Sequence, residues 1–219
     1  MRIKPNNKRR IGLFFLLIGT LLILLVPIND YLIKKQSMNQ LTVSATEIEE
    51  NERLDADFDF DSVEEISLFD VLQANWQNKN LPVIGQIHIP DLNLHLPILK
   101  GMQESNLLVG AGTVKEEQTM GEANYSLISH NTRNPSLLFA PLHRAEESMK
   151  VYLTDMKEVF VYSITVHEII EPTRIDVLED LPNQTILTLI TCNYNGEKRL
   201  LTQGAFVEKG SIEDYKTVF

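Results

Sequence analysis

The sequence predicts an all-β domain, a barrel or a sandwich, that follows one membrane-spanning helix. Two observations carry this prediction. Short runs rich in β-branched and apolar residues recur from about residue 82 to the C-terminal part of the chain, with turn signals between them. A single uncharged apolar run of spanning length stands near the N-terminus, at residues 11–28.

The apolar run IGLFFLLIGTLLILLVPI predicts the helix. At 1.5 Å per residue it would span about 27 Å, which is close to the hydrocarbon thickness of a bilayer. A cleaved signal peptide is the competing interpretation, but the run is longer than a usual signal and no small-residue cleavage site follows it. We therefore expect residues 11–28 to be an uncleaved anchor that contacts membrane lipid, and the protein to cross the membrane once.

Basic residues precede the anchor and indicate its orientation. Lys4, Lys8, Arg9 and Arg10 lie before it, although Lys34 and Lys35 beyond it weaken the contrast. Because positive charge favours the cytoplasmic side, we expect residues 1–10 to form a cytoplasmic tail. The rest of the chain would then lie outside the cell.

Residues 29–61 become increasingly acidic and predict a solvated, extended spacer. A short amphipathic helix is expected next, over residues 62–76, because Ser62 and Glu65 fit a capping box. It would open a domain that spans residues 62–219. The formal net charge of −10 argues against nucleic acid as a partner, since phosphate binding needs clustered Lys and Arg.

The expected strands follow in order through this domain. They are PVIGQIHI (82–89), LNLHLPIL (92–99), ANYSLISH (123–130), KVYLTD (150–155), EVFVYSITVHEII (158–170), QTILTLITC (184–192) and RLLTQGAFV (199–207). Only the stretches 106–108 and 140–148 have a briefly helical pattern. The pattern therefore predicts a β-rich domain with very little helix.

Cys192 is the only cysteine of the chain, so it cannot close an internal disulfide. It can be a buried hydrophobe, half of an intermolecular bridge or a reactive thiol. Asn195 and Gly196 form a strong hairpin signal, and a turn centred on them places Arg199 directly across from Cys192. A guanidinium there would stabilise a thiolate and a developing oxyanion. Alternatively, the arginine stem only covers the edge of the sheet.

A nucleophilic cysteine usually needs a histidine partner, and the chain has five histidines. His88, His95 and His167 lie inside strand patterns and are expected to be ordinary sheet residues. His143 has the pattern of a helix-surface residue. His130 ends a strand and begins a polar, turn-rich stretch, which is where site residues are commonly supported.

These motifs resemble the active-site signatures of the sortases. The resemblance rests on TLITC (188–192), SLISH (126–130) and the arginine that opens the next strand, and it extends over about residues 81–207 to the class A, housekeeping type. It implies an eight-stranded β-barrel in the envelope of a Gram-positive cell. It also implies a cysteine transpeptidase that cleaves LPXTG signals of surface proteins between Thr and Gly. The product would be attached to the amine of a peptidoglycan precursor, lipid II, or of its cross-bridge.

The resemblance also implies roles for single residues. Cys192 would be the nucleophile that forms a thioester, His130 the acid and base, and Arg199 the group that stabilises the oxyanion or holds the substrate backbone. The Leu-Pro pocket and adjacent substrate contacts would be formed by Ile128, Ser129, Ile175, Val177, Leu178, Ile190 and Thr191. The apolar members of this set fit an ordinary core equally well.

We expect no metal and no other cofactor. Some class A sortases bind calcium with loop acids, and Glu116, Glu117, Glu122, Glu179 and Asp180 lie in comparable regions, but their spacing gives no EF-hand-like series. Two other functions stay open. A pilin-polymerising sortase usually carries an Asp-Pro-aromatic lid and often a C-terminal membrane segment, neither of which is found here. A non-catalytic, membrane-tethered β-domain that binds envelope ligands would use Cys192 only as a buried residue.

Overall fold

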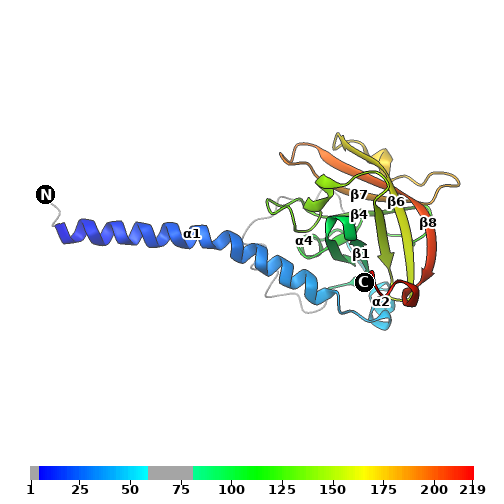
Figure 1. Ribbon diagram of the computed structural model, residues 1–219, viewed down its shortest axis with the longest axis horizontal. Helices are drawn as coiled ribbons and strands as arrows, with labels where there is room; N and C mark the ends of the chain where they lie inside the picture. The colour runs from blue at the N-terminus through cyan, green and yellow to red at the C-terminus, as the bar shows by residue number, and fades with distance from the viewer. Residues whose placement is uncertain (1–4, 59–80) are drawn as a thin grey trace.

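The computed structural model describes residues 5–58 and 81–219, and its centre is a closed β-barrel (Figure 1). The strands are β1 (Val83–Ile89), β2 (Leu94–Leu99), β3 (Ala111–Thr113), β4 (Asn124–Ile128), β5 (Lys150–Thr154), β6 (Glu158–Ile170), β7 (Ile186–Cys192) and β8 (Arg199–Ser211). They follow one another around the barrel in the order β1-β2-β3-β4-β7-β8-β6-β5. The predicted all-β class and the eight-stranded barrel are confirmed.

Strand direction brings distant parts of the chain to one end of the barrel. Most neighbours are antiparallel, but β4 and β7 are parallel, with Ile128 opposite Ile190. Parallel neighbours need a long crossover, and here β5 and β6 lie between them in sequence. The carboxyl ends of β4 and β7 consequently lie side by side, and β8 starts beside the end of β7.

The barrel interior is filled by aliphatic and aromatic side chains. Leu127 of β4, together with Leu187 and Leu189 of β7, belongs to the main buried cluster, which also includes Tyr125 and Tyr162. Burying one such aliphatic side chain stabilises the fold by about 1.5–3 kcal/mol. The packed interior gives the strand ends a rigid support.

Helix α1 (Pro5–Gln40) projects away from the barrel (Figure 1). Its segment Gly12–Gln40 is long and apolar enough to cross a membrane, by length and composition. The last turns of α1 pack on the barrel: Ile33 is 2 % exposed and joins the main core. Asp30 also accepts a hydrogen bond of 3.0 Å from Asn134, which lies on the loop that follows His130.

The expected extended spacer at residues 29–61 is therefore wrong for much of its length. Helix α1 runs on to Gln40, and helix α2 (Ala45–Asn51) follows with a capping box between Ser44 and Glu47. The physical reason is burial, because the fold covers Ile33, and it covers Ile48 in spite of the glutamates on either side of it. The expected helix at residues 62–76 lies outside the described residues.

Short helical turns occupy several connections. They are η2 (Pro90–Leu92), α4 (Glu104–Leu107), η3 (Ala140–Arg144), η4 (Ile175–Leu178) and η5 (Ile212–Tyr215). The two stretches with a helical pattern correspond to α4 and η3. The pattern did not predict η4, which lies on the β6–β7 loop and matters for the site described next.

Candidate active site at the ends of β4, β7 and β8

Three candidate residues lie in one row across neighbouring strands. Cys192, the last residue of β7, is directly paired with Arg199, the first residue of β8, so the predicted pairing is confirmed. On the other side of β7, the parallel register of Ile128 with Ile190, continued two residues further, brings His130 level with Cys192. Neighbouring strands are about 4.8 Å apart. Thiol, imidazole and guanidinium side chains are thus brought to one end of the barrel.

The turn between β7 and β8 differs from the expected one. The amide of Gly196 donates to the carbonyl of Asn193 at 3.0 Å, so Tyr194 and Asn195 are the central residues, and Gly196 follows with φ of 77°. Two hydrogen bonds between Asn193 and Lys198, at 3.0 and 3.2 Å, close the loop below this turn. Because they keep these two residues opposite each other, the longer tip leaves the strand register unchanged.

The backbone around His130 is held from several sides. The amide of Ser129 donates to the carbonyl of Ile190 at 3.3 Å, and the amide of Phe139 donates to the carbonyl of His130 at 3.1 Å. Asn131 adds a side-chain hydrogen bond of 3.2 Å to the carbonyl of Asn193. Only 6 % of His130 is exposed. The histidine is therefore a buried, positioned residue and not a mobile loop side chain.

Glu104 touches His130 and was not identified from the sequence. Its Oε1 lies 3.1 Å from Nε2 of His130. Glu104 is the first residue of α4, and 26 positions separate it from the histidine. No local pattern links two residues so far apart, so only the folded chain reveals this contact.

His143 is not the isolated surface residue that its helical pattern predicted. Its ring stacks on the ring of Tyr194 with centroids 3.7 Å apart and an interplanar angle of 19°. Burial lowers the pKa of His143, and a hydrogen bond to the backbone carbonyl of Cys192 partly offsets this. The prediction is wrong because η3 packs beneath the β7–β8 turn, which sequence spacing does not reveal.

The expected substrate residues gather beside this row. Ile128 and Ile190 are buried in two small apolar clusters; Leu178 of η4 packs against both clusters, and Val177 packs against the one that contains Ile190. Ile175, also on η4, is 67 % exposed. These side chains lie together as expected, and their role as a Leu-Pro pocket stays a prediction.

Ser129 and Thr191 have structural hydrogen bonds in this structure. The hydroxyl of Ser129 donates to the carbonyl of Gly110, and the hydroxyl of Thr191 donates to the carbonyl of Ser129, both at 2.7 Å. Both residues are buried. Substrate contact by either hydroxyl stays a prediction. Because each hydroxyl already donates its proton to a backbone carbonyl, it could bind substrate only by accepting a hydrogen bond.

Comparison with known proteins decides the family. A model of the sortase domain matches residues 87–207. The sequence is 40 % identical over 205 residues to sortase A of Streptococcus agalactiae, covering 85 % of this chain and 83 % of that protein. The chain belongs to the sortase family. Sortase A of Listeria monocytogenes is 34 % identical over 208 residues, covering 94 % and 91 % of the two chains.

Structural comparison agrees with the sequence. The solved structure of the Listeria monocytogenes sortase A matches with a TM-score of 0.57 and 34 % identity, covering 59 % of this chain and 90 % of that one. The resemblance to class A sortases is thereby confirmed, and the chain is a cell-wall sorting transpeptidase of this class. The matched segment 87–207 contains His130, Cys192 and Arg199.

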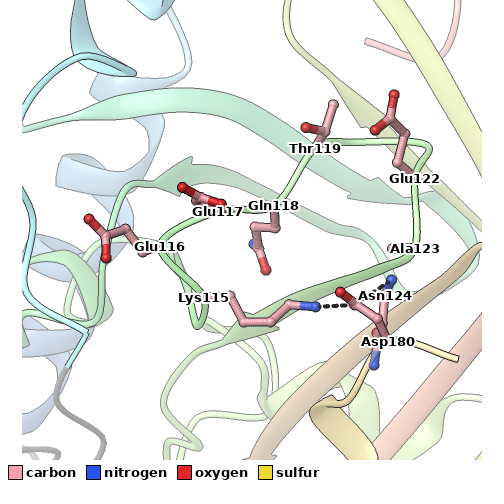
Figure 2. Close-up of a pocket in the computed structure, with 9 residues that line it drawn as sticks. All are labelled: Lys115, Glu116, Glu117, Gln118, Thr119, Glu122, Ala123, Asn124 and Asp180. Carbon is pink, nitrogen blue, oxygen red and sulfur yellow. Dashed lines mark hydrogen bonds and ion pairs between the residues drawn. The ribbon is translucent and has the colours of Figure 1, made fainter.

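Four of the acidic loop residues of this sortase, Glu116, Glu117 and Glu122 of the β3–β4 loop and Asp180 of the β6–β7 loop, line a pocket (Figure 2). Lys115 Nζ lies 2.6 Å from Asp180 Oδ1, and the amide of Asn124 donates to the same oxygen at 3.1 Å. The lysine is the main reason that the pKa of Asp180 is lowered. Glu122 points away from Glu116 in Figure 2. Within residues 5–58 and 81–219, no three His, Cys, Asp or Glu side chains form a group that could hold a metal.

Proposed function

We propose that this sortase cleaves an LPXTG sorting signal between Thr and Gly and joins the threonine carboxyl to an amine of a peptidoglycan precursor such as lipid II. The observation that carries the proposal is the single row of His130, Cys192 and Arg199 across β4, β7 and β8. Acyl transfer by cysteine requires a nucleophile, a proton-transfer group and a donor for the oxyanion. The row contains one candidate for each.

In the acylation step, the thiolate of Cys192 attacks the threonine carbonyl carbon and a C–S bond forms. Arg199 donates hydrogen bonds to the negatively charged oxygen of the tetrahedral intermediate. When the C–N bond breaks, the imidazolium of His130 gives its proton to the departing glycine amine. A thioester on Cys192 and a free amine are the products.

In the second step, the amine of the precursor attacks the thioester carbonyl and gives a proton to neutral His130. The C–S bond then breaks, which returns the thiolate of Cys192 and leaves a new amide. Water can attack in the same way and would release the free acid. The burial of His130 supports this scheme, because a buried base is shielded from bulk solvent.

The sorting signal would bind on the apolar residues beside the row. Ile175, Val177 and Leu178 on η4, with Ile128 and Ile190 on the strands, offer apolar surface to the Leu and Pro side chains. The loop that carries η4 is held by buried Asn124, whose amide donates to the carbonyls of Val177 and Glu179. These hydrogen bonds attach the η4 loop to β4, which supports a pocket whose η4 side is held in place.

We also propose the arrangement at the membrane. Residues 11–28 would cross the bilayer, residues 1–10 would stay in the cytoplasm, and the catalytic domain within residues 62–219 would face the outside. The cations before the apolar run support this orientation. The contact between Asp30 and Asn134 supports a barrel held close to the end of the anchor.

Intact-protein mass spectrometry tests the function. After incubation with an LPXTG peptide, we expect an acyl adduct on Cys192 that disappears when an amine is added. Cys192→Ala should show no adduct and no transpeptidation, and a peptide with the Thr-Gly order reversed is the matched substrate control. Unchanged transpeptidation by Cys192→Ala would contradict the proposal. Resistance of Cys192 to alkylation in the folded protein would favour the non-catalytic alternative.

A further inference from the structure

The contact between Glu104 and His130 has a chemical consequence if the histidine transfers protons, as the proposed function requires. Oε1 of Glu104 lies 3.1 Å from Nε2 of His130. A carboxylate can only accept a hydrogen bond, so this contact needs a proton on Nε2. The neutral ring is then held in one tautomer, with Nδ1 as the nitrogen left to exchange a proton with the thiol.

The element that carries Glu104 is fixed in place. Asn106 of α4 is 0 % exposed, and its amide donates to the carbonyls of Lys100 and Gly101 at 2.9 and 3.3 Å. Gly101 adopts φ of 84°, and its amide donates to the hydroxyl of Thr113 at 2.8 Å. A rigid support of this kind places a side chain within the tolerance that catalysis needs.

The environment strengthens the interaction. The His130 side chain is 7 % exposed and that of Glu104 is 32 % exposed, so solvent screens the pair only partly. The other oxygen, Oε2, is buried and has no hydrogen-bond partner among the described residues. A buried carboxylate oxygen without a partner destabilises the fold, which is typical of groups retained for a role in a site.

From this geometry we propose that Glu104 is a positioning residue that orients the imidazole of His130 and stabilises its protonated form during acyl transfer. It would complete a Cys-His-Glu arrangement with Cys192, in which the carboxylate itself keeps its charge. Other charged or titratable groups at this end of the barrel include Arg199 on β8, His143 on η3 and His167 on β6, which lies near His143.

Glu104→Gln tests the proposal, because it keeps the shape and removes the charge. We expect kcat to fall about tenfold with KM within about twofold. Glu104→Asp should recover part of the loss. Glu122→Gln removes a loop carboxylate outside the row and is the matched control.

A second readout does not depend on turnover. Nitrogen NMR of the His130 ring should show the Nε2–H tautomer in the wild-type protein and a mixture of tautomers in Glu104→Gln, with an unchanged melting temperature. A Glu104→Gln variant with wild-type kcat and wild-type tautomer would overturn the role of Glu104 while Cys192 still forms its adduct. If instead no adduct forms on wild-type Cys192, the proposed function fails, and the NMR result still decides whether Glu104 orients the ring.

Discussion

Two pairs of histidines lie on different sides of the barrel and have contrasting surroundings. His130 and His143 border the end of β7, where the cysteine lies. His88 and His95 are directly paired on β1 and β2, with ring centroids 4.8 Å apart, and Phe219 packs against both rings. In the barrel order, β1, which carries His88, and β7, which ends at Cys192, are four strands apart in either direction.

The difference shows how position in a strand decides what a histidine can do. Nε2 of His95 donates a hydrogen bond of 2.9 Å to Oε1 of Gln86, and Nδ1 of His88 donates to the carbonyl of Val218. Burial lowers the pKa of His95 to about 4, with His88 as a smaller contributor, so the ring is neutral near pH 7. His130, just beyond the end of its strand, instead meets groups from other strands and loops. The candidate site residues His130, Cys192 and Arg199 therefore lie at or just beyond strand ends, and not in strand interiors.

The largest expected effect separates the two pairs. His130→Ala should reduce turnover of an LPXTG peptide by about a thousandfold or more, because the leaving amine and the incoming amine lose their proton-transfer group. His95→Gln, the matched change on the other side of the barrel, should leave turnover within about twofold. Steady-state assays with peptide and amine measure both. Equal losses in the two variants would remove the distinction between the pairs.

A smaller effect is expected at Arg199, the last residue of the row of His130, Cys192 and Arg199. Arg199→Lys keeps the charge but removes the planar set of donors, so turnover should fall more than about tenfold. Lys198→Gln is the control, since the Lys198 side chain is exposed and pairs with Glu171 at the surface. Near-normal kcat for Arg199→Lys would mean that charge alone is sufficient at this position.

The smallest effect concerns stability and the pair on β1 and β2. The pKa of His95 lies near 4 in the folded protein, below its ordinary value of 6.5. Between these values the unfolded chain binds a proton that the folded chain does not, so the free energy of unfolding falls as the pH drops through this window. Thermal melts should show a melting temperature lower by a few degrees at pH 5 than at pH 7.

The same measurement on His95→Gln provides the control. This variant lacks one of the two titrating groups, so its melting temperature should change less with pH. The pKa of His88 is also lowered by burial, so part of the pH dependence should remain. A wild-type melting temperature that rises on acidification would contradict the assignment of a neutral, buried pair.

Much of the fold was predictable because its signals are local. Alternation and β-branched residues indicated β1, β2 and β4 to β8, while β3, only three residues long, lacked a distinct signal. The helical extension beyond residue 29 could not be predicted, because the acidic composition suggested solvation and the burial of Ile33 and Ile48 depends on distant strands. Tertiary burial outweighed local composition in this segment.

The amino-acid sequence alone determined that the N-terminal run is long and apolar enough to cross a membrane, and it determined the strand pattern and the pairing of Cys192 with Arg199. The first depends on hydrophobicity, the second on the two-residue repeat of side chains along a strand, and the third on one short turn. All three are set by residues that are close together in the chain. Only the tertiary structure decided that Glu104 touches His130 and that His143 stacks on Tyr194 in the β7–β8 turn. Such contacts join loops that are distant in sequence. The loops meet because the strands to which they are attached are neighbours in the closed barrel.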